Sequence, residues 1–548
     1  MGFPTIYGLK GTFGIDSNYT TDEGMNKPKK SSGARPMGSS LSSPEEQILT
    51  APRPVRRSSF TTVQTVLHTL GALLTIEGAL LLLPLVFVLV FGEKGTSRAF
   101  LLSSAACFAG GLLFRLIFKR GQIFYRQSLL ICGSAWIVLS LFACLPFFFT
   151  TDKSFLDCYF ETVSGFTTTG ITIYTDIAAL ARSLLFWRSL IQWLGGLGIL
   201  TLFLAVTFRS NGAYYQLFSA ESHKIDSSRP TPSVFRTVVI LWSLYGAFTF
   251  AEFLILTGLG MKVFDSLCHS LTTLSTGGFS PYDESIDYFR QAGYAHYRAI
   301  EYTITFFMLL GGINFLLHFK LLTGSFREVF RDTELRFFLL LILAATGLIL
   351  LDHGLSVSRS APGEEDMRHT VFTVVSVITT TGFGTVDIND AFFPAMARQI
   401  LLLFMLFGGC VGSTAGGIKT LRIYVLYRLF VLQIKRLVVP RRAVSELVID
   451  GRIFPVREIK RITGLFIGWV VLIALGGFLT ALLTNLDSWQ AFSGMFSAVG
   501  NIGPCYFSVQ QMSELPAAVK LAYIFGMLAG RLEILPILLL ASRRAWRS

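Results

Sequence analysis

The chain repeats one short polar motif four times, and each copy stands between long apolar stretches. The copies are SGFTTTGIT at 164–172, LSTGGFS at 274–280, TTTGFGT at 379–385 and GNIGP at 500–504. Aligned on one glycine each, they bring Gly170, Gly277, Gly382 and Gly503 into register. The spacing is about 110 residues, and because an internal repeat defines the unit of a fold, we expect four copies of one structural unit.

Ten apolar segments are long enough to cross a membrane, since a hydrocarbon core about 30 Å thick needs roughly 20 apolar residues in a helix. Two of them, 66–92 and 98–118, precede the repeats. The other eight form pairs that flank the motifs: 127–149 and 183–208, 234–258 and 299–322, 334–352 and 394–430, and 462–485 and 515–541. We therefore expect an all-α polytopic membrane protein with ten spans.

The composition argues against a set of soluble domains. Hydrophobic residues make up 52% of the chain and charged residues only 15%, whereas soluble domains carry about 25% charged residues. The net charge of +13 does not indicate a nucleic acid partner, because the basic residues lie between apolar runs and form no basic domain. A lipid bilayer explains them better. The seven cysteines are scattered without a CxxC pair, which favours packing over disulfides or metal.

The basic residues also predict the orientation, since loops on the cytoplasmic side of a membrane carry an excess of Lys and Arg. With the N-terminus inside, every basic cluster falls on the cytoplasmic side and all four glycine motifs fall on the other. Both termini are then cytoplasmic. The expected parts are a disordered tail at 1–60, two extra helices at 61–120, repeats at 127–208, 234–322, 334–430 and 462–541, and a basic loop at 431–461.

The four motifs together indicate a cation pore. Each follows a stretch too short to span, namely 155–168, 263–274, 368–380 and 489–499. Non-helical backbone at membrane depth is tolerated only where protein buries it or where it lines a wet cavity. Backbone carbonyls there can replace the hydration shell of a cation, and glycine permits the backbone conformations that this needs. One such motif would more often be an ordinary turn, but four on one side of the membrane are not explained that way.

These motifs make the chain resemble the Trk/Ktr/HKT superfamily of potassium transporters, and its bacterial Trk branch most closely. Two further stretches carry the resemblance, GSTAGGIKTLR at 412–422 and GRLEILP at 530–536. The resemblance implies four pseudo-repeats of helix, pore helix, filter loop and helix around one central pore, in a bacterial cytoplasmic (inner) membrane. The filter residues that it implies, as the sites that hold K⁺, are Thr168, Thr169, Gly170, Thr276, Gly277, Thr380, Thr381, Gly382, Asn501, Ile502 and Gly503.

Some details of the filter stay open. Glycine rather than serine at Gly170 implies a preference for potassium over sodium. The fourth motif departs from the pattern, because Asn501 and Ile502 stand where the others have threonines, and Cys505 follows Pro504. In the second motif Gly278 adjoins Gly277, so the filter glycine of that loop could lie one residue further on.

The segment 394–430 is too long for one span, and its middle, the loop at 408–420, is rich in glycine. Lys419 does not complete a phosphate-binding GxxxxGK[ST] motif, because Ile418 separates it from the preceding glycine. A flexible break in a spanning helix explains the loop better, and the resemblance implies that it lies beneath the filter and opens by moving. The candidate gate residues are Gly408, Gly409, Gly412, Gly416, Gly417, Lys419 and Arg531.

Two charged residues in the last span, Arg531 and Glu533, have two readings. They could form a local ion pair, or Arg531 could place a positive charge below the filter near the loop, since ionisable residues inside a membrane usually face a cavity or a partner. Glu161, on the first pore helix, is expected to be a structural hydrogen-bonding group.

Potassium uptake is thus the leading function, and a sodium or mixed-cation channel or a cation-coupled symporter of the same fold is the alternative. No nucleophile–base pair, metal cluster or cofactor loop suggests an enzyme, so we expect no cofactor and K⁺ as the transported ion. The resemblance also implies a homodimer that docks cytoplasmic nucleotide-binding regulatory subunits of the TrkA type. This chain carries no dinucleotide-binding unit of its own, because GGLGIL at 195–200 lies within an apolar helix.

Overall fold

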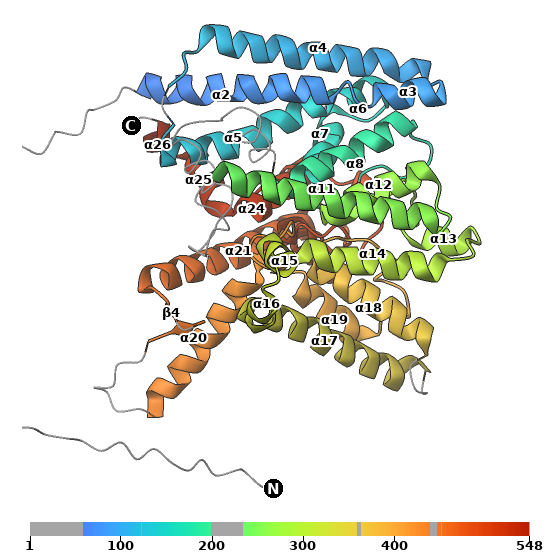
Figure 1. Cartoon of the computed structure of the whole chain (residues 1–548), viewed down its shortest axis with the longest axis vertical. Coiled ribbons are helices and arrows are strands. Elements are labelled where there is room, and N and C mark those ends of the chain that lie inside the picture. The colour runs from blue at the N-terminus through green and yellow to red at the C-terminus, as the bar shows by residue number, and fades with distance from the viewer. Residues whose placement is uncertain are drawn as a thin grey trace, which may run out of the picture. The chain divides into compact units, whose positions relative to one another are not determined.

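A computed structural model describes residues 59–121, 123–198, 234–358, 363–438, 446–450 and 452–546. Almost all of the expected N-terminal tail lies outside these residues, as do the end of the first repeat at 199–208 and part of the basic loop at 439–445. The described part is almost entirely helical, with two short two-stranded sheets (Figure 1).

The first three helices precede the repeats and lie together along one side (Figure 1). They are α2 (Ser59–Leu80), α3 (Leu85–Phe91) and α4 (Lys94–Ile117). Helices α2 and α4 approach closely at Gly71 and Gly111, where a β-carbon on either glycine would lie 2.7 Å from the carbonyl oxygen of the other. Small residues allow such close approach between helices in a membrane.

The repeats then follow one plan: a long helix, a short helix, a loop and a second helix, which is interrupted in the second, third and fourth repeats. The first repeat contains α5 (Tyr125–Ala143), α6 (Leu145–Thr150), α7 (Phe155–Phe166) and α8 (Arg182–Gly196), and the second contains α11 (Val234–Gly258), α12 (Val263–Leu274), α13 (Asp287–Gln291), α14 (Tyr297–Gly312) and α15 (Phe315–Leu322). The third contains α17 (Thr333–His353), α18 (Glu364–Ile378), α19 (Ala395–Phe404) and α20 (Thr420–Val438). The fourth contains α21 (Val456–Leu483), α22 (Ser488–Gly500), α23 (Val509–Ser513), α24 (Ala517–Leu532) and α25 (Ile534–Ala541). Helix α16 (Phe326–Arg331) and a π-helical turn (Gly354–Ser358) flank α17, and α26 (Arg543–Trp546) ends the described chain.

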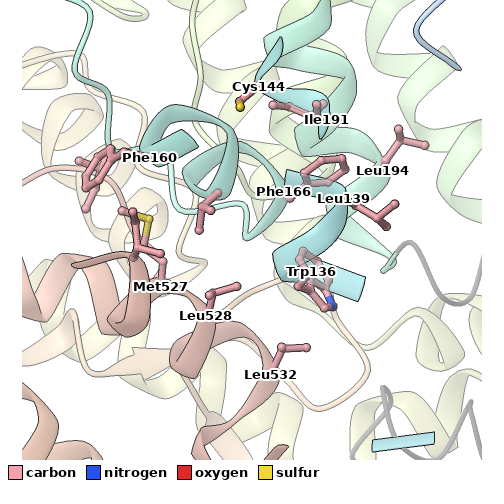
Figure 2. Packing of buried hydrophobic residues seen from close by; sticks show 14 of the residues in the cluster. Trp136, Leu139, Cys144, Phe160, Phe166, Ile191, Leu194, Met527, Leu528 and Leu532 are labelled. Atoms are coloured by element: carbon pink, nitrogen blue, oxygen red, sulfur yellow. The ribbon is translucent and has the colours of Figure 1, made fainter. Parts of the chain in front are cut away.

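The short helices α7, α12, α18 and α22 precede the four glycine motifs, as the sequence predicts. They have 12, 12, 15 and 13 residues, too few to span a membrane. Figure 2 shows why α7 is held in place: Phe160 and Phe166 of this helix lie among Trp136 and Leu139 of α5, Ile191 and Leu194 of α8, and Met527 and Leu528 of α24. The apolar core therefore surrounds the short helices and fixes the loops that follow them.

Within the residues that the structure describes, six helices are long and apolar enough to cross a membrane: Thr62–Phe91, Lys94–Ile117, Arg126–Thr150, Arg236–Gly258, Thr333–Ser356 and Val456–Leu483. Helices α14 and α15 make a seventh if they are one span, bent by 102°. The three remaining expected spans correspond to α8, which approaches the end of a described range, and to the interrupted pairs α19–α20 and α24–α25. The number of ten spans stays a prediction.

Three of the second helices, α8, α14 and α24, carry glycines that pack on the short helices. A β-carbon on Gly195 of α8 would overlap the Phe166 carbonyl oxygen, and one on Gly530 of α24 would overlap that of Val499. In α14 the corresponding contact joins Gly311 to the Leu274 carbonyl oxygen, at 3.2 Å from the added carbon. Each of these helices therefore packs against the last turn of the short helix in the same repeat.

Candidate functional site

The four glycine loops form a closed ring in chain order. A β-carbon added to Gly170 would overlap the Gly277 carbonyl oxygen of the second loop. In the same way Gly278 meets Thr381 of the third loop, and Gly382 meets Ile502 of the fourth. The ring closes because a β-carbon on Gly503 would lie 3.0 Å from the Thr169 carbonyl oxygen of the first loop. Four segments that are far apart in sequence thus converge on one place.

In the ring, the second loop is shifted by one residue from its alignment in the sequence. Gly170, Gly382 and Gly503 have φ of 80°, 85° and 109°, and the second loop matches them at Gly278, with φ of 76°. Gly277 takes the position of Thr169, Thr381 and Ile502, whose carbonyls each face the glycine of the preceding loop in the ring. The alignment of Gly277 with Gly170 is therefore off by one residue, because the local sequence TGG fits either register and only the neighbouring loops decide between them.

A second conformational signature precedes each glycine. Thr168, Thr276, Thr380 and Asn501 have φ of 53°, 52°, 57° and 54°. A β-branched residue in this left-handed region is strained by about 1–3 kcal/mol, and such strain persists only where the surroundings impose it. Asparagine tolerates this region better than most residues, so the fourth loop keeps the backbone of the others despite its different side chain.

Two side-chain oxygens of the ring loops lack a hydrogen-bond partner. Among the described residues, the Thr168 hydroxyl and the Asn501 side-chain carbonyl oxygen are buried and have no hydrogen-bond partner in the protein. A buried polar atom without a partner costs free energy, which a bound ion or water would offset. Oxygen ligands of this kind suit a monovalent cation.

A cavity of about 400 Å³ lies directly against the ring, and Gly170, Gly278, Gly382 and Gly503 all line it. Its wall also carries four carboxylates and one guanidinium group: Asp283, Glu284, Asp287, Asp387 and Arg188. A cleft lined mostly by one sign of charge raises the local concentration of the opposite ion. No sequence motif marks these carboxylates, which lie in polar loops and, for Asp287, at the start of α13.

Glu161 is a structural group, as expected. Its carboxylate accepts hydrogen bonds from Arg188 Nε and Nη2 at 2.9 and 2.7 Å, from the Thr172 hydroxyl at 3.0 Å and from the Ile173 amide at 3.0 Å. Arg188 also donates to the Ser280 carbonyl at 3.2 Å. The side chains of this pair are 1% and 0% exposed, and together they join the segments that follow the first and second ring loops.

Replacing Arg188 with alanine is expected to destabilise the protein by about 3–5 kcal/mol, because it leaves a buried carboxylate without its cation. The measurement is the apparent midpoint of thermal unfolding in detergent. Arg290→Ala serves as the control, since Arg290 pairs with Asp287 while its side chain is 42% exposed, and such pairs contribute only about 0–1 kcal/mol. Equal losses in the two variants would contradict the structural role of Arg188.

Gln192 of α8 holds the second loop from outside the ring. Its side-chain amide donates to the Gly277 carbonyl at 2.6 Å, and its carbonyl oxygen accepts from the Phe279 amide at 3.0 Å. No sequence motif marks this residue, because its two partners lie 85 and 87 residues away in the chain.

The loop at 408–420 lies against the ring. The Gly416 amide donates to the Thr380 hydroxyl at 2.7 Å, and a β-carbon on Gly416 would lie within 2.5–3.0 Å of the Asn501 side chain. The Thr414 hydroxyl lies within 3.0 Å of the carbonyls of Leu274 and Gly311. The tip of the loop thus touches the second, third and fourth loops of the ring or their short helices.

The base of this loop is a pair of parallel strands, β1 (Phe407–Gly408) and β2 (Ile418–Lys419). The strands can come this close because their glycines have no β-carbon. One on Gly408 would overlap the Gly416 carbonyl oxygen, and one on Gly417 would lie 3.1 Å from Gly408. Gly409 packs on Gly312 of α14, and Gly412 and Gly417 have φ of 81° and 67°. Each of the five glycines named from the sequence therefore has a steric or conformational reason in the loop.

Arg531 joins this loop to the first repeat. Its guanidinium donates to the Thr414 carbonyl at 2.5 Å and to the Gly195 and Gly196 carbonyls at 2.5 and 2.6 Å. Lys419 donates to the Ala415 carbonyl within the loop. Glu533, at the break between α24 and α25, pairs with Arg422 of α20. Arg531 therefore lies at the loop, and Glu533 forms an ion pair that links the last span to α20; a role of Arg531 in gating stays a prediction.

The described residues contain no group of three or more His, Cys, Asp or Glu side chains that could hold a metal ion. Six of the cysteines are buried, and Cys505 is half-buried.

Comparison with known proteins gives consistent results. A family model described as TrkH, a cation transport protein, matches residues 97–547. The Trk system potassium uptake protein TrkH of Salmonella typhimurium is 32% identical over 487 residues, which are 87% of this chain and 98% of that protein. The protein of the same name from Escherichia coli K12 is 32% identical over 488 residues, with the same coverage. The crystal structure of the potassium transporter TrkH from Vibrio parahaemolyticus is similar with a TM-score of 0.75 and 29% identity, over 88% of this chain and all of that one.

Proposed function

This chain belongs to the TrkH family of cation transport proteins, and from that premise we propose that it takes up potassium through the ring of four glycine loops. It is a membrane ion transporter and not an enzyme. The observation that carries the proposal is the closed ring of contacts in which each of the four glycines faces a backbone carbonyl of a neighbouring loop. The glycines are Gly170, Gly278, Gly382 and Gly503. Oxygens gathered in this way would replace the hydration shell of the ion.

The cavity with four carboxylates would be the entrance to this filter. It would concentrate cations before the ring, and the membrane potential would then draw them inward by about 2.3 kcal/mol per 100 mV for each charge. On the other side of the ring, the loop at 408–420 would close the path, with Arg531 holding it in place. Opening would require the loop to leave Gly195, Gly196 and the ring.

The surroundings follow from the family and the sequence. We place the protein in a bacterial cytoplasmic membrane with ten spans, both termini in the cytoplasm and the filter entrance outside. A homodimer and cytoplasmic nucleotide-binding subunits of the TrkA type would be its partners, and the basic loop at 431–461 would be their docking surface. No resident cofactor is needed, since the ion is the cargo.

The test is ion flux in proteoliposomes that contain only this protein, with K⁺ or Na⁺ and with or without an imposed voltage. We expect voltage-driven flux of K⁺ that exceeds that of Na⁺. Equal flux of the two ions would favour a mixed-cation channel, and uphill flux driven by a proton or sodium gradient would favour a symporter. No flux in the native protein and in Arg531→Ala would refute the proposal.

The register of the second loop gives a prediction of its own. Gly278→Ala is expected to reduce K⁺ flux much more than Gly277→Ala, by about tenfold or more, because only Gly278 has a positive φ and meets a backbone carbonyl. A β-carbon on Gly277 meets the end of the Gln192 side chain, which can shift at the cost of its hydrogen bonds to the loop, whereas the backbone carbonyl facing Gly278 cannot. The two variants are compared at equal protein density in proteoliposomes. A larger loss of K⁺ flux in Gly277→Ala would instead make Gly277 the counterpart of Gly170, as the sequence alignment has it.

A further inference from the structure

One carboxylate of the third repeat holds both arms of the loop at 408–420. Glu334 lies in the first turn of α17 and is 8% exposed. Its Oε1 accepts a hydrogen bond from the Val411 amide at 2.7 Å and another from the Leu421 amide at 3.1 Å. Val411 belongs to the first arm of the loop, and Leu421 follows the second arm at the start of α20, so a single oxygen connects the two.

The position of Glu334 is itself fixed. Asp332 caps α17, because its carboxylate accepts from the Leu335 amide at 2.8 Å. The neighbouring Thr333 donates its hydroxyl to Asp450, which lies in the turn between β3 (Val448–Ile449) and β4 (Arg452–Ile453). The first turn of α17 is therefore held both by its own cap and by this hairpin, and it provides a stationary support for the loop.

The loop is held at its tip, along its first arm and at its base. Along the first arm, the Cys410 amide donates to the Gly312 carbonyl at 2.9 Å, and the Gly412 carbonyl accepts from the Phe315 amide at 3.1 Å. At the tip, Thr414 and Gly416 touch Arg531 and the ring. At the base, the strands β1 and β2 pair with each other, which keeps the two arms together but does not attach them to the rest of the protein. Glu334 attaches both arms to α17, so its two hydrogen bonds oppose any movement that carries the arms away from this helix.

We propose that Glu334 is a positioning residue that holds the loop at 408–420 closed by anchoring both of its arms to α17. This inference rests on the proposed function of the loop as a gate. A carboxylate that accepts two backbone amides binds them more strongly than a neutral acceptor would. Its loss would favour the open arrangement without altering the filter, because Glu334 contacts the loop and not the ring.

The first experiment measures K⁺ and Na⁺ flux in proteoliposomes of the full chain without any partner, for the native protein, Glu334→Ala, Glu334→Gln and Asp352→Ala. We expect Glu334→Ala to raise K⁺ flux at least about tenfold with an unchanged ratio of K⁺ to Na⁺, since the loss of one such hydrogen bond shifts an equilibrium by roughly that factor. Glu334→Gln keeps an acceptor oxygen and is expected to stay closer to the native flux than to that of Glu334→Ala.

Asp352 is the matched control. It lies on the same helix, at the end of α17 away from the loop. Its carboxylate accepts a hydrogen bond from the Ala397 amide at 2.8 Å. Asp352→Ala is expected to keep the native flux. Three results would overturn the inference: native flux in Glu334→Ala, a leak in Asp352→Ala as large as in Glu334→Ala, or a rise in flux in which the preference for K⁺ is lost.

The second experiment does not depend on transport. Ser413 lies at the tip region of the loop and is half-buried, so Ser413→Cys can report the exposure of the loop to a small thiol reagent. Labelling is expected to be at least about tenfold faster when Glu334→Ala is added, because the loop leaves its closed position more often. An unchanged rate would refute the anchoring role even if the protein passed no ion, whereas faster labelling with no flux in any variant would count only against the proposed transport.

Discussion

Arg531→Ala is expected to raise K⁺ flux about 10- to 100-fold in proteoliposomes that contain this protein alone. The substitution removes the donor to the carbonyls of Thr414, Gly195 and Gly196, and hydrogen bonds from a charged group contribute about 1.5–3 kcal/mol each. It also removes a positive charge from the path that the ion would take. Both effects favour passage of a cation, and flux under an imposed voltage measures them together.

Arg531→Lys separates the two effects. Lysine keeps the positive charge, but its ammonium group cannot reproduce the fork of the guanidinium that reaches three carbonyls at once. If the tether to the loop closes the path, the lysine variant leaks almost as much as the alanine variant. If the charge closes it, the lysine variant stays close to the native flux. Native flux in both variants would remove Arg531 from the gate.

Gly170→Ser is expected to reduce the preference for K⁺ over Na⁺ by at least about tenfold. Gly170 has φ of 80°, a conformation that costs a residue with a β-carbon about 1–2 kcal/mol. The same β-carbon would overlap the Gly277 carbonyl oxygen, which must then move. Because Gly277 belongs to the ring, the spacing of the oxygens around the ion changes. The permeability ratio under bi-ionic conditions is the measurement.

Gly384→Ser is the control for this substitution. Gly384 lies two residues after Gly382, but a β-carbon there would come no closer than 3.6 Å to another residue, at the Val386 carbonyl oxygen. Added bulk is therefore accommodated, and the native permeability ratio is expected. If Gly170→Ser also kept the native ratio, the ring of glycine loops would not be the part of the protein that discriminates between the two ions.

The sequence predicted the family and the general plan of the fold. The matches to TrkH proteins confirm the resemblance that rested on the glycine motifs and on the stretches at 412–422 and 530–536. The short helices before the motifs and the break within 394–430 also lie where they were expected. These features depend on local composition, since runs of apolar residues, short amphipathic stretches and clusters of glycine can each be recognised without knowledge of their neighbours.

The errors and omissions concern contacts between distant segments. Gly277 and Gly278 are equally plausible filter glycines in sequence, and only the contacts with Gly170 and Thr381 of neighbouring loops show that Gly278 is the counterpart. No sequence pattern marks Glu334 or Gln192, because each binds backbone groups of another element and neither belongs to a motif.

Asn501 shows how the structure accommodates a departure from the repeat. Its backbone has the left-handed conformation of the three threonines in the other loops. Its side-chain amide donates to the Thr169 hydroxyl at 2.8 Å and to the Met527 carbonyl at 2.9 Å, so it joins the fourth loop to the first. The difference in sequence at this position therefore leaves the ring closed.

The sequence by itself thus determined the four repeats, their apolar helices, the position of the polar loops and the glycine-rich interruption, because these are properties of consecutive residues. Only the tertiary structure decided the register of the ring and the partners of Arg188, Glu334 and Arg531. The physical reason is that these contacts join groups that lie far apart in the chain, such as Arg531 and Gly195 at a separation of 336 residues. Local sequence does not encode which carbonyl a side chain will reach, and the packing of four repeats against one another does.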